Sequence, residues 1–231
     1  MLVEGIGEEG QAKLKAARAL VIGAGGLGSP VLYYLVAAGV GTVGIVDDDK
    51  VNISNLQRQI LYTTPDIGML KTFSAGQKLT ALNPEVKITL CNCRFTEENA
   101  EKITLDYDFI VDCCDNFATK LLINDVCVRM KKPYSHGAVV DMRGEVMTYT
   151  PGAACYRCVY DALPQEGQSS ASPQTGIIGA VAGITGSIQA TEAIKCLIGM
   201  RDLLTDRLLV TDAKTMKFIS LKVKKLSSCI C

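Results

Sequence analysis

The chain has 231 residues, enough for one α/β domain with a buried core, and its apolar (48%) and charged (21%) fractions are ordinary for a globular protein. The 24 basic and 24 acidic residues cancel, so charge gives no reason to expect nucleic acid or an anionic membrane as a partner. No apolar run reaches the roughly 18 residues of a membrane span, and the N-terminus lacks a signal-peptide core. We expect a cytoplasmic protein whose ten cysteines are reduced thiols, some of them metal ligands, rather than a disulfide framework.

The first elements predict a complete β-α-β unit. A short polar helix precedes the apolar strand at 19–22, and a glycine-rich loop follows. Ser29 is expected to cap the next helix, Pro30 suits its first turn, and Gly39 ends it before a second strand at 42–49. Such a unit with a glycine loop is typical of a nucleotide-binding fold.

The rest of the chain continues as one α/β domain without internal repeats. Residues 159–175 are small and polar and predict a mobile loop. The other predicted elements are strands at 86–91 and 108–113, a helix at 118–130, two strands around a tight Arg143-Gly144 turn, a helix at 180–197 and a terminal hairpin of RLLVTD and KFISLKV.

The glycine loop, GAGGLGSP, contains the G-x-G-x-x-G pattern. Glycines let the backbone approach a phosphate, and the amides at the helix start attract negative charge. Asp47, 19 residues after Gly28, can accept hydrogen bonds from a ribose. Glycines that merely allow close packing of helix on strand are the alternative. The pattern indicates a nucleotide, but it suits NAD and an adenosine phosphate equally well.

Charged residues further along distinguish these nucleotides. A triphosphate carries nearly four charges, and its transfer chemistry uses cationic side chains and a metal. Arg58 and Lys71 can clamp a triphosphate, and Asp115, beside Asn116, offers an oxygen ligand to Mg²⁺. Taken singly, the cations could be surface charges and Asp115-Asn116 a helix cap. Their joint occurrence near strand ends favours ATP.

Several of these motifs together resemble the ThiF/MoeB/HesA family, bacterial relatives of ubiquitin-activating enzymes that adenylate ubiquitin-like sulfur-carrier proteins. The motifs are GAGGLGSP, the stretch from Asp47 to Gln59, the Lys71 site, DCCDN and CYRC, and the similarity runs from about Ile6 to Lys225. The resemblance implies a homodimer with a Rossmann-like, mixed sheet of roughly eight strands, parallel in its nucleotide-binding half, with helices on both faces. It implies a single domain over 1–231, with a nucleotide-binding half at about 1–132 and a carrier-binding half, holding a mobile crossover loop and a zinc site, at about 133–231.

The resemblance also assigns roles within the site. The reaction it implies is attack of a carrier's C-terminal glycine carboxylate on the α-phosphate of ATP, which needs no nucleophile from the enzyme. The carrier would be of the ThiS/MoaD type, ending in Gly-Gly, in sulfur transfer for thiamine, molybdopterin or a related product. Catalytic roles fall to Asp115, Arg58 and Lys71. The nucleotide and Mg²⁺ would be held by Gly23, Gly25, Gly26, Gly28, Asp47 (at the ribose), Asp49, Asn55, Arg58, Gln59, Lys71, Asp115 and Asn116.

Four cysteines predict a structural zinc site. Cys155 and Cys158 have C-x-x-C spacing, which lets two thiolates converge on one ion, and Cys229 and Cys231 could complete a tetrahedral set. In the family the second pair is normally another C-x-x-C, whereas here it is C-x-C. Free thiols, or a disulfide formed on oxidation, are the alternatives.

Two positions depart from the family pattern. Ser172 stands where thiazole-forming members carry a cysteine, and a serine cannot carry a persulfide, so adenylation without covalent sulfur transfer through this loop is expected. Family members also begin with a segment whose arginine reaches the partner subunit's ATP, and Arg18 lies too close to the first strand to replace it.

The remaining side chains of interest predict structural roles. His136, the only histidine, is expected to make hydrogen bonds rather than to act in catalysis, and Cys91, Cys93, Cys113, Cys114 and Cys127 are expected to be small buried residues. Two other functions stay open at this stage. One is a nucleotide-binding partner protein without turnover, and the other is an NAD-dependent oxidoreductase, against which Arg58 and Lys71 argue.

Overall fold

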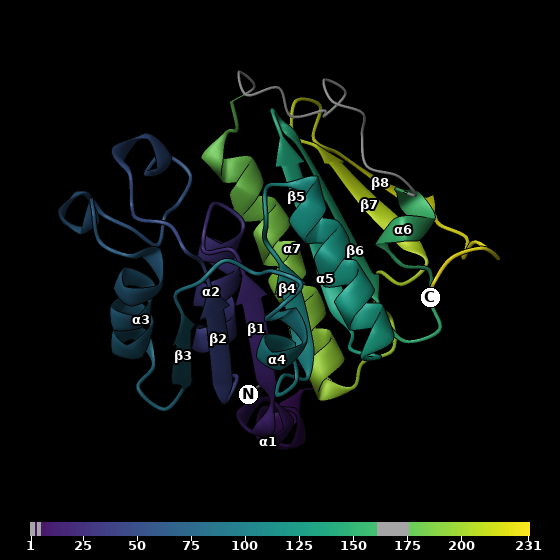
Figure 1. The fold of residues 1–231 in the computed structure, drawn as a ribbon, viewed down its shortest axis with the longest axis horizontal. Coiled ribbons are helices and arrows are strands. Elements are labelled where there is room, and N and C mark those ends of the chain that lie inside the picture. The colour runs from purple at the N-terminus through teal and green to yellow at the C-terminus, as the bar shows by residue number, and fades with distance from the viewer. Residues whose placement is uncertain (1–2, 4–5, 161–175) are drawn as a thin grey trace.

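A mixed sheet of eight strands forms the centre of the protein, in the order β3-β2-β1-β4-β5-β6-β7-β8 (Figure 1). The computed structural model describes residues 3, 6–160 and 176–231. The strands are β1 (Arg18–Ile22), β2 (Thr42–Val46), β3 (Lys87–Cys91), β4 (Phe109–Asp112), β5 (Tyr134–Val140), β6 (Arg143–Tyr149), β7 (Arg207–Asp212) and β8 (Lys217–Lys222). The predicted fold class is confirmed.

The first five strands of the chain run parallel to one another. The chain adds β2 and β3 on one side of β1, then crosses to the other side for β4 and β5. The strand order therefore reverses between β1 and β4. In open α/β sheets such a reversal leaves a crevice outside the carboxyl ends of the strands, where ligands bind.

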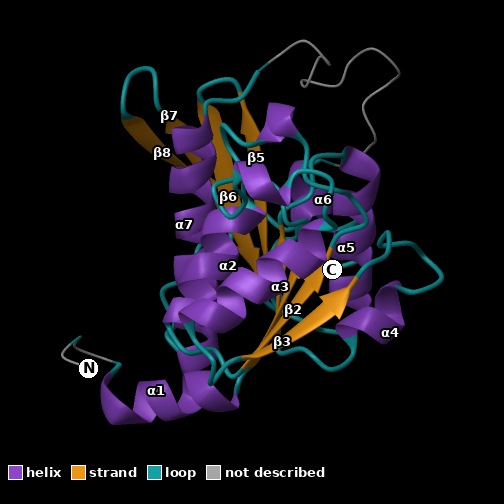
Figure 2. Ribbon diagram, turned by 90° about the vertical axis from the view of Figure 1, so that its left-hand side faces the viewer, coloured by secondary structure: helices purple, strands orange, loops and turns teal. Residues whose placement is uncertain are grey.

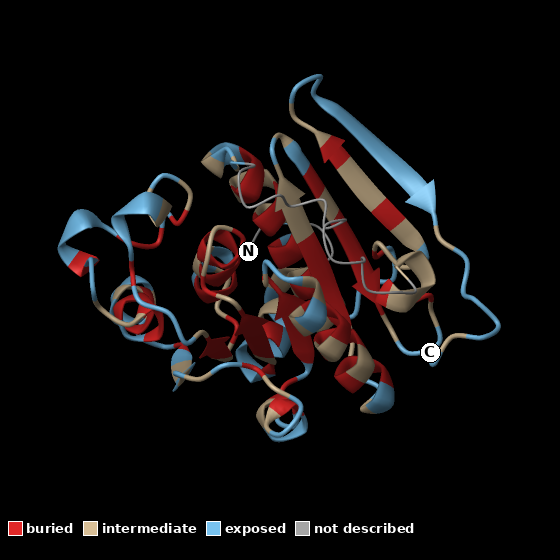
Figure 3. Cartoon of the chain, turned by 45° about the horizontal axis from the view of Figure 1, so that its top comes forward, coloured by how far each residue is buried: buried red, intermediate tan, exposed pale blue. Residues whose placement is uncertain are grey.

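The last three strands are antiparallel and lie at the opposite end of the sheet from β3 (Figure 1). The turn between β5 and β6 lies at Asp141–Met142, two residues before the predicted Arg143-Gly144 turn, and Asp141 has a φ of 56°. Aspartate tolerates this left-handed conformation better than most residues, which fixes the turn there. Every residue of β8 is exposed, and Figure 3 shows this edge strand in pale blue.

Helices cover both faces of the sheet (Figures 1 and 2). One apolar core joins the strands to α1 (Gly7–Ala16), α2 (Gly28–Ala37), α3 (Lys71–Leu82) and α7 (Gly179–Ile198), and a second core joins them to α4 (Ala100–Thr104), α5 (Phe117–Arg129) and α6 (Tyr156–Val159). The 3-10 helices η1 (Ile53–Asn55) and η2 (Thr64–Asp66) lie in the excursion between β2 and α3.

The structure corrects several expectations about local elements. Ser29 is not a helix cap, because α2 already begins at Gly28 and the Ser29 hydroxyl donates to the Gly25 carbonyl, whereas Pro30 lies in the first turn as expected. Helix α1 is the short polar helix predicted before β1. Helices α2, α5 and α7 begin and end within three residues of their predicted bounds, and α3, α4 and α6 were not predicted. The predicted mobile loop and Ser172 lie almost wholly outside the described residues. Among those residues, none of the helices is long and apolar enough to cross a membrane.

Candidate functional site

A cavity of about 720 Å³ lies beside the glycine loop and extends along the sheet to β5, β6 and β7. Its lining includes Asp47, Arg58, Lys71 and Asp115. These residues follow different elements: Asp47 comes after β2, Arg58 after η1, Lys71 begins α3, and Asp115 follows β4. The topology thus brings to one cavity the cations and the two carboxylates that the sequence singled out.

The glycines of the loop divide into two roles. A Cβ atom at Gly23 would lie 2.7 Å from the Cys113 carbonyl oxygen, and one at Gly28 would overlap the Gly23 carbonyl oxygen. These two are needed for close packing, and Gly23 also has a φ of 96°. Gly25 and Gly26 line the cavity, and a Cβ at either would meet only side chains, at 3.4 Å or more. Both interpretations of the glycine pattern therefore apply, and Gly23, which also lines the cavity, belongs to both.

Asp47 is fixed by its neighbours before any ligand arrives. Its two carboxylate oxygens accept the backbone N–H groups of Ala24, at 2.8 Å, and Asp49, at 2.9 Å. Lys71, which is buried, donates to the Asp49 carboxylate at 2.8 Å and lies 3.8 Å from Asp47. Burial raises the pKa of Asp47, and the Lys71 charge and the two backbone bonds oppose that rise. The strand end therefore carries a carboxylate held in one orientation beside a cation.

Arg58 and Gln59 line the same cavity, beside Gly26 and Gly25. The Arg58 guanidinium donates to the Asn55 side chain at 2.9 Å and to the Ser54 carbonyl at 3.3 Å, both neutral acceptors. Gln59 is buried, and its Oε1 atom has no hydrogen-bond partner among the described residues. A buried amide oxygen without a partner is costly, so it is an acceptor available to a bound group. The positive charge of Arg58 is likewise not neutralised by an acidic side chain within the described structure.

Asn116 has a structural role as a helix cap, whereas the Asp115 side chain is exposed on the cavity. The Asn116 side chain accepts from the Thr119 N–H at 2.9 Å, so it is the N-cap of α5, as the simpler interpretation predicted, although it also lines the cavity. Asp115 is exposed on the cavity. Among the described residues, no three Asp, Glu or His side chains converge as a metal site. A magnesium ion here would therefore be held by one carboxylate with substrate phosphates, as Mg²⁺ commonly is.

The far end of the cavity contains a charged network that we did not predict. Asp112, the last residue of β4, is buried and contacts Lys120 of α5 at 3.2 Å and Nδ1 of His136 at 2.8 Å. The other ring nitrogen of His136 lies 3.3 Å from Oε1 of Glu145, and the Tyr160 hydroxyl donates to Oε2 of Glu145 at 2.8 Å. The hydrogen-bonding role expected for His136 is confirmed, and its partners turn out to be two carboxylates.

Both carboxylates of this network are ionised at neutral pH. Burial raises the pKa of Asp112 and of Glu145, but the charges and hydrogen bonds of Lys120 and His136 outweigh burial, so that both pKa values lie below the ordinary range. Sequence inspection missed Lys120 and Glu145 because each is a single charge within an otherwise ordinary helix or strand. The position of Asp112 at the end of a buried strand is the one local signal that could have pointed to the network.

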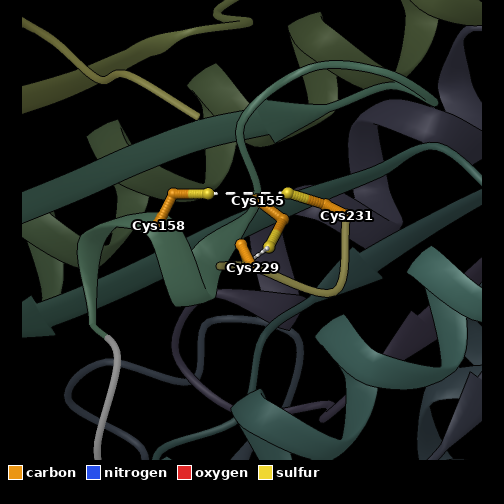
Figure 4. A group of neighbouring side chains, drawn as sticks. All are labelled: Cys155, Cys158, Cys229 and Cys231. Atoms are coloured by element: carbon orange, nitrogen blue, oxygen red, sulfur yellow. Dashed lines mark hydrogen bonds between the residues drawn. The ribbon is translucent and has the colours of Figure 1, made fainter. Parts of the chain in front are cut away.

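The four predicted zinc ligands come together although 70 residues lie between Cys158 and Cys229 (Figure 4). Their sulfur atoms all lie within 4.8 Å of one another, with Cys155 and Cys229 at 3.4 Å and Cys158 and Cys231 at 3.5 Å. A tetrahedral Zn²⁺ with bonds of about 2.3 Å has sulfur separations of about 3.8 Å. The residues therefore fit zinc in number, chemistry and spacing, and the C-x-C pair converges as well as the C-x-x-C pair.

The other cysteines only partly match expectation. Cys113 and Cys127 are buried, whereas Cys91, Cys93 and Cys114 are half-buried. Cys93, Cys113 and Cys114 line the cavity. The sequence did not show this, because the three residues follow strands whose carboxyl ends meet only in the folded sheet.

Comparison with known proteins identifies the class. Residues 1–231 match the ThiF family, to which the chain belongs. A sulfur carrier protein adenylyltransferase of Thermus thermophilus is 42% identical over 99% of this chain and 87% of its own length. The SAMP-activating enzyme E1 of Haloferax volcanii is 40% identical over 94% of this chain and 81% of its own length. These relatives confirm the predicted enzyme class, an adenylyltransferase.

A solved structure shows the same fold. E. coli MccB in complex with MccA-N7isoASN superimposes with a TM-score of 0.86 over 96% of this chain and 68% of that chain, at 25% identity. Another relative, the probable adenylyltransferase/sulfurtransferase MoeZ of Mycobacterium tuberculosis, is 40% identical over 97% of this chain, which spans 59% of MoeZ. The fold is thus that of a family of adenylating enzymes.

Proposed function

We propose that the protein catalyses ATP-dependent adenylation of the C-terminal glycine carboxylate of a small ubiquitin-like sulfur-carrier protein that ends in Gly-Gly. The observation that carries the proposal is one continuous cavity, with the glycine loop, Asp47, Arg58 and Lys71 on its nucleotide side and the Lys120–Glu145 wall at its other end. Two substrates that react with each other need such a shared space. The printed names of the Thermus and Haloferax relatives agree with this activity.

The reaction forms one phosphorus–oxygen bond and breaks another. A carboxylate oxygen of the carrier attacks the α-phosphorus of ATP, and the bond to the β-phosphate oxygen breaks. The electron pair leaves with pyrophosphate, and the carrier becomes an acyl-adenylate. No proton has to move, because the attacking carboxylate is already ionised, so the enzyme contributes position and charge.

Each side chain of the nucleotide end has a task in this scheme. Asp47 and the unpartnered Gln59 amide oxygen accept hydrogen bonds from the ribose hydroxyls, while Gly25 and Gly26 leave space for the phosphates. Arg58 and Lys71 neutralise the triphosphate as charge accumulates on pyrophosphate. Asp115 would hold a magnesium ion, which supplies further neutralisation of the phosphates when bound.

The cysteine group would hold a structural zinc. Cys155 is the N-cap residue of α6 and Cys158 lies within it, and Tyr160, which follows this short helix, contacts Glu145 at the cavity wall. A metal bound by all four thiolates would tie residues 229–231 to α6 and contribute folding free energy. This role is structural, and the ion takes no part in adenylation.

The assay for this function is ATP–pyrophosphate exchange with ubiquitin-like carriers that end in Gly-Gly. We expect exchange that depends on both the carrier and Mg²⁺, and no exchange with a carrier whose terminal glycine is deleted. Normal ATP binding without exchange for any such carrier would instead support a nucleotide-binding partner protein without turnover. Tighter binding of NAD than of ATP would restore the oxidoreductase alternative.

Assembly and location complete the proposal. The homodimer is inferred from the family resemblance, and the cytoplasmic location is the expectation drawn from the sequence. Light scattering of the purified protein tests the dimer. The pathway end product, whether thiamine, molybdopterin or another sulfur-containing product, depends on which carrier supports exchange.

A further inference from the structure

In the charged network at the far end of the cavity, the Glu145 carboxylate is partly exposed to the cavity. Glu145 lies on β6 opposite Ala138 of β5, and both residues line the cavity. Its side chain is 25% exposed, in contrast to the complete burial of His136 behind it. A ligand in the cavity can therefore reach this carboxylate, which lines the cavity together with Lys120 and Tyr160, whereas Asp112 and His136 lie behind them.

Among the described residues, hydrogen-bond donors fill only about half of the acceptor positions of the Glu145 carboxylate. His136 faces Oε1 and the Tyr160 hydroxyl bonds Oε2, one protein donor for each oxygen among the described residues. An ionised carboxylate has about four acceptor positions. Within the described part of the chain, two acceptor positions of Glu145 therefore have no protein donor, while its orientation is fixed by His136 and Tyr160.

His136 explains how a carboxylate remains charged at this place. Both of its ring nitrogens face carboxylate oxygens, of Asp112 and of Glu145, and ionised carboxylates only accept hydrogen bonds. The ring therefore lies between the two acids and holds both carboxylates in place. Lys120 neutralises Asp112 from the other side, at 3.2 Å. Glu145 is thus held by this network and lines the cavity.

The fixed negative charge of Glu145 favours hydrogen-bond donors beside it and repels other anions. The carboxylate of an incoming acceptor would be repelled, so it must pass Glu145 and lie nearer to the nucleotide. The group beside Glu145 has to be a hydrogen-bond donor, and a polypeptide tail offers its backbone N–H groups. We propose that Glu145 binds a backbone N–H of the acceptor's C-terminal Gly-Gly segment, with His136 and Tyr160 as positioning residues. This inference rests on the proposed function.

Substitutions in the enzyme provide the first test, by ATP–pyrophosphate exchange. Glu145→Ala is expected to raise the KM for a Gly-Gly-ending carrier by about 30-fold, the usual order for loss of a hydrogen bond to a charged group, with the KM for ATP unchanged. Glu145→Gln keeps an acceptor oxygen and should recover most of the loss. Tyr160→Phe removes only the hydroxyl and keeps the ring contact with Phe117, so a smaller rise in the same constant is expected.

Glu192→Gln is the matched control. Glu192 is also buried, but it accepts from Thr148 and from the Leu204 N–H, and it does not line the cavity. We expect this variant to lose stability without a selective change in the carrier KM. If Glu145→Ala does not fold, Tyr160→Phe still tests the proposal, because its effect on packing is small.

The acceptor provides the second and more direct test. Semisynthetic carriers with N-methylglycine at either of the last two positions lack one N–H each. One of them should lose about 30-fold in KM with the wild-type enzyme and almost nothing further with Glu145→Ala, which is the signature of a direct contact in a double-mutant cycle. Equal losses with both enzymes at both positions would overturn the proposal. Absence of exchange with the unmodified carrier would overturn the proposed function instead.

Discussion

Replacement of Lys71 by methionine separates a role in ATP use from a role in folding. Lys71 begins α3, its side chain is 5% exposed, and its ammonium donates to Asp49 at 2.8 Å. Methionine keeps the buried stem and removes only the charge. Loss of one charge-assisted hydrogen bond costs about 1.5–3 kcal/mol, so kcat/KM for ATP should fall by about 10- to 150-fold.

The same substitution should destabilise the fold much less than loss of a fully buried ion pair. Asp49 is 69% exposed and regains water, and Asp47 keeps its backbone donors at 2.8 and 2.9 Å. We expect a loss of about 1–2 kcal/mol, well below the roughly 3–5 kcal/mol for breaking a buried pair. At about 2–4 °C per kcal/mol for a domain of this size, Tm should fall by about 2–8 °C.

Lys78 of the same helix provides the control. It pairs with Asp66 and donates to the Leu61 carbonyl at 2.9 Å, outside the cavity. Lys78→Met should lower Tm and leave the KM for ATP unchanged in pyrophosphate exchange at saturating carrier. An equal effect of the two substitutions on kcat/KM for ATP, or none from Lys71→Met, would refute the assignment of Lys71 to the triphosphate.

Three further outcomes follow from the site and its surroundings. Asp115→Asn should slow exchange by about 100-fold, as loss of a metal-linked charge does, and should change the unfolding free energy in urea by less than about 0.5 kcal/mol because the residue is exposed. Cys158→Ser should abolish the binding of one zinc per chain in elemental analysis and lower Tm, and wild-type protein purified without zinc yet equally stable would contradict this. Burial raises the pKa of Asp66, but the bonds from Lys78 and Thr63 outweigh it and lower that pKa to about 2. The stability difference between wild type and Asp66→Asn should therefore be constant above about pH 5 and shrink as pH falls from about 4 towards 2, in unfolding curves measured at each pH.

The local pattern of the sequence was sufficient for the nucleotide half of the fold. The glycine loop and the two flanking strands occur in the predicted order and place, although β2 ends at Val46 rather than at residue 49, because their backbone path is set by residues close together in the chain. The Ser29 cap and the Arg143-Gly144 turn were misplaced by one or two residues, since competing local hydrogen bonds and the left-handed Asp141 decide such boundaries. Helix α3 was not predicted, because its few apolar residues do not form a long enough periodic pattern in the sequence to indicate a helix.

In the site, too, some features could be predicted from the sequence and others only from the tertiary structure. Motifs named the separate groups, such as Arg58, Asp115 and the two cysteine pairs, because their chemistry is recognisable in a few consecutive residues. Only the tertiary structure joined Asp112, His136 and Glu145 into a network, since parallel and antiparallel pairing sets which side chains of β4, β5 and β6 lie side by side. A hydrogen bond between distant segments depends on the register of the strands. A single charged residue in the sequence does not indicate that register, so its partner could not be predicted.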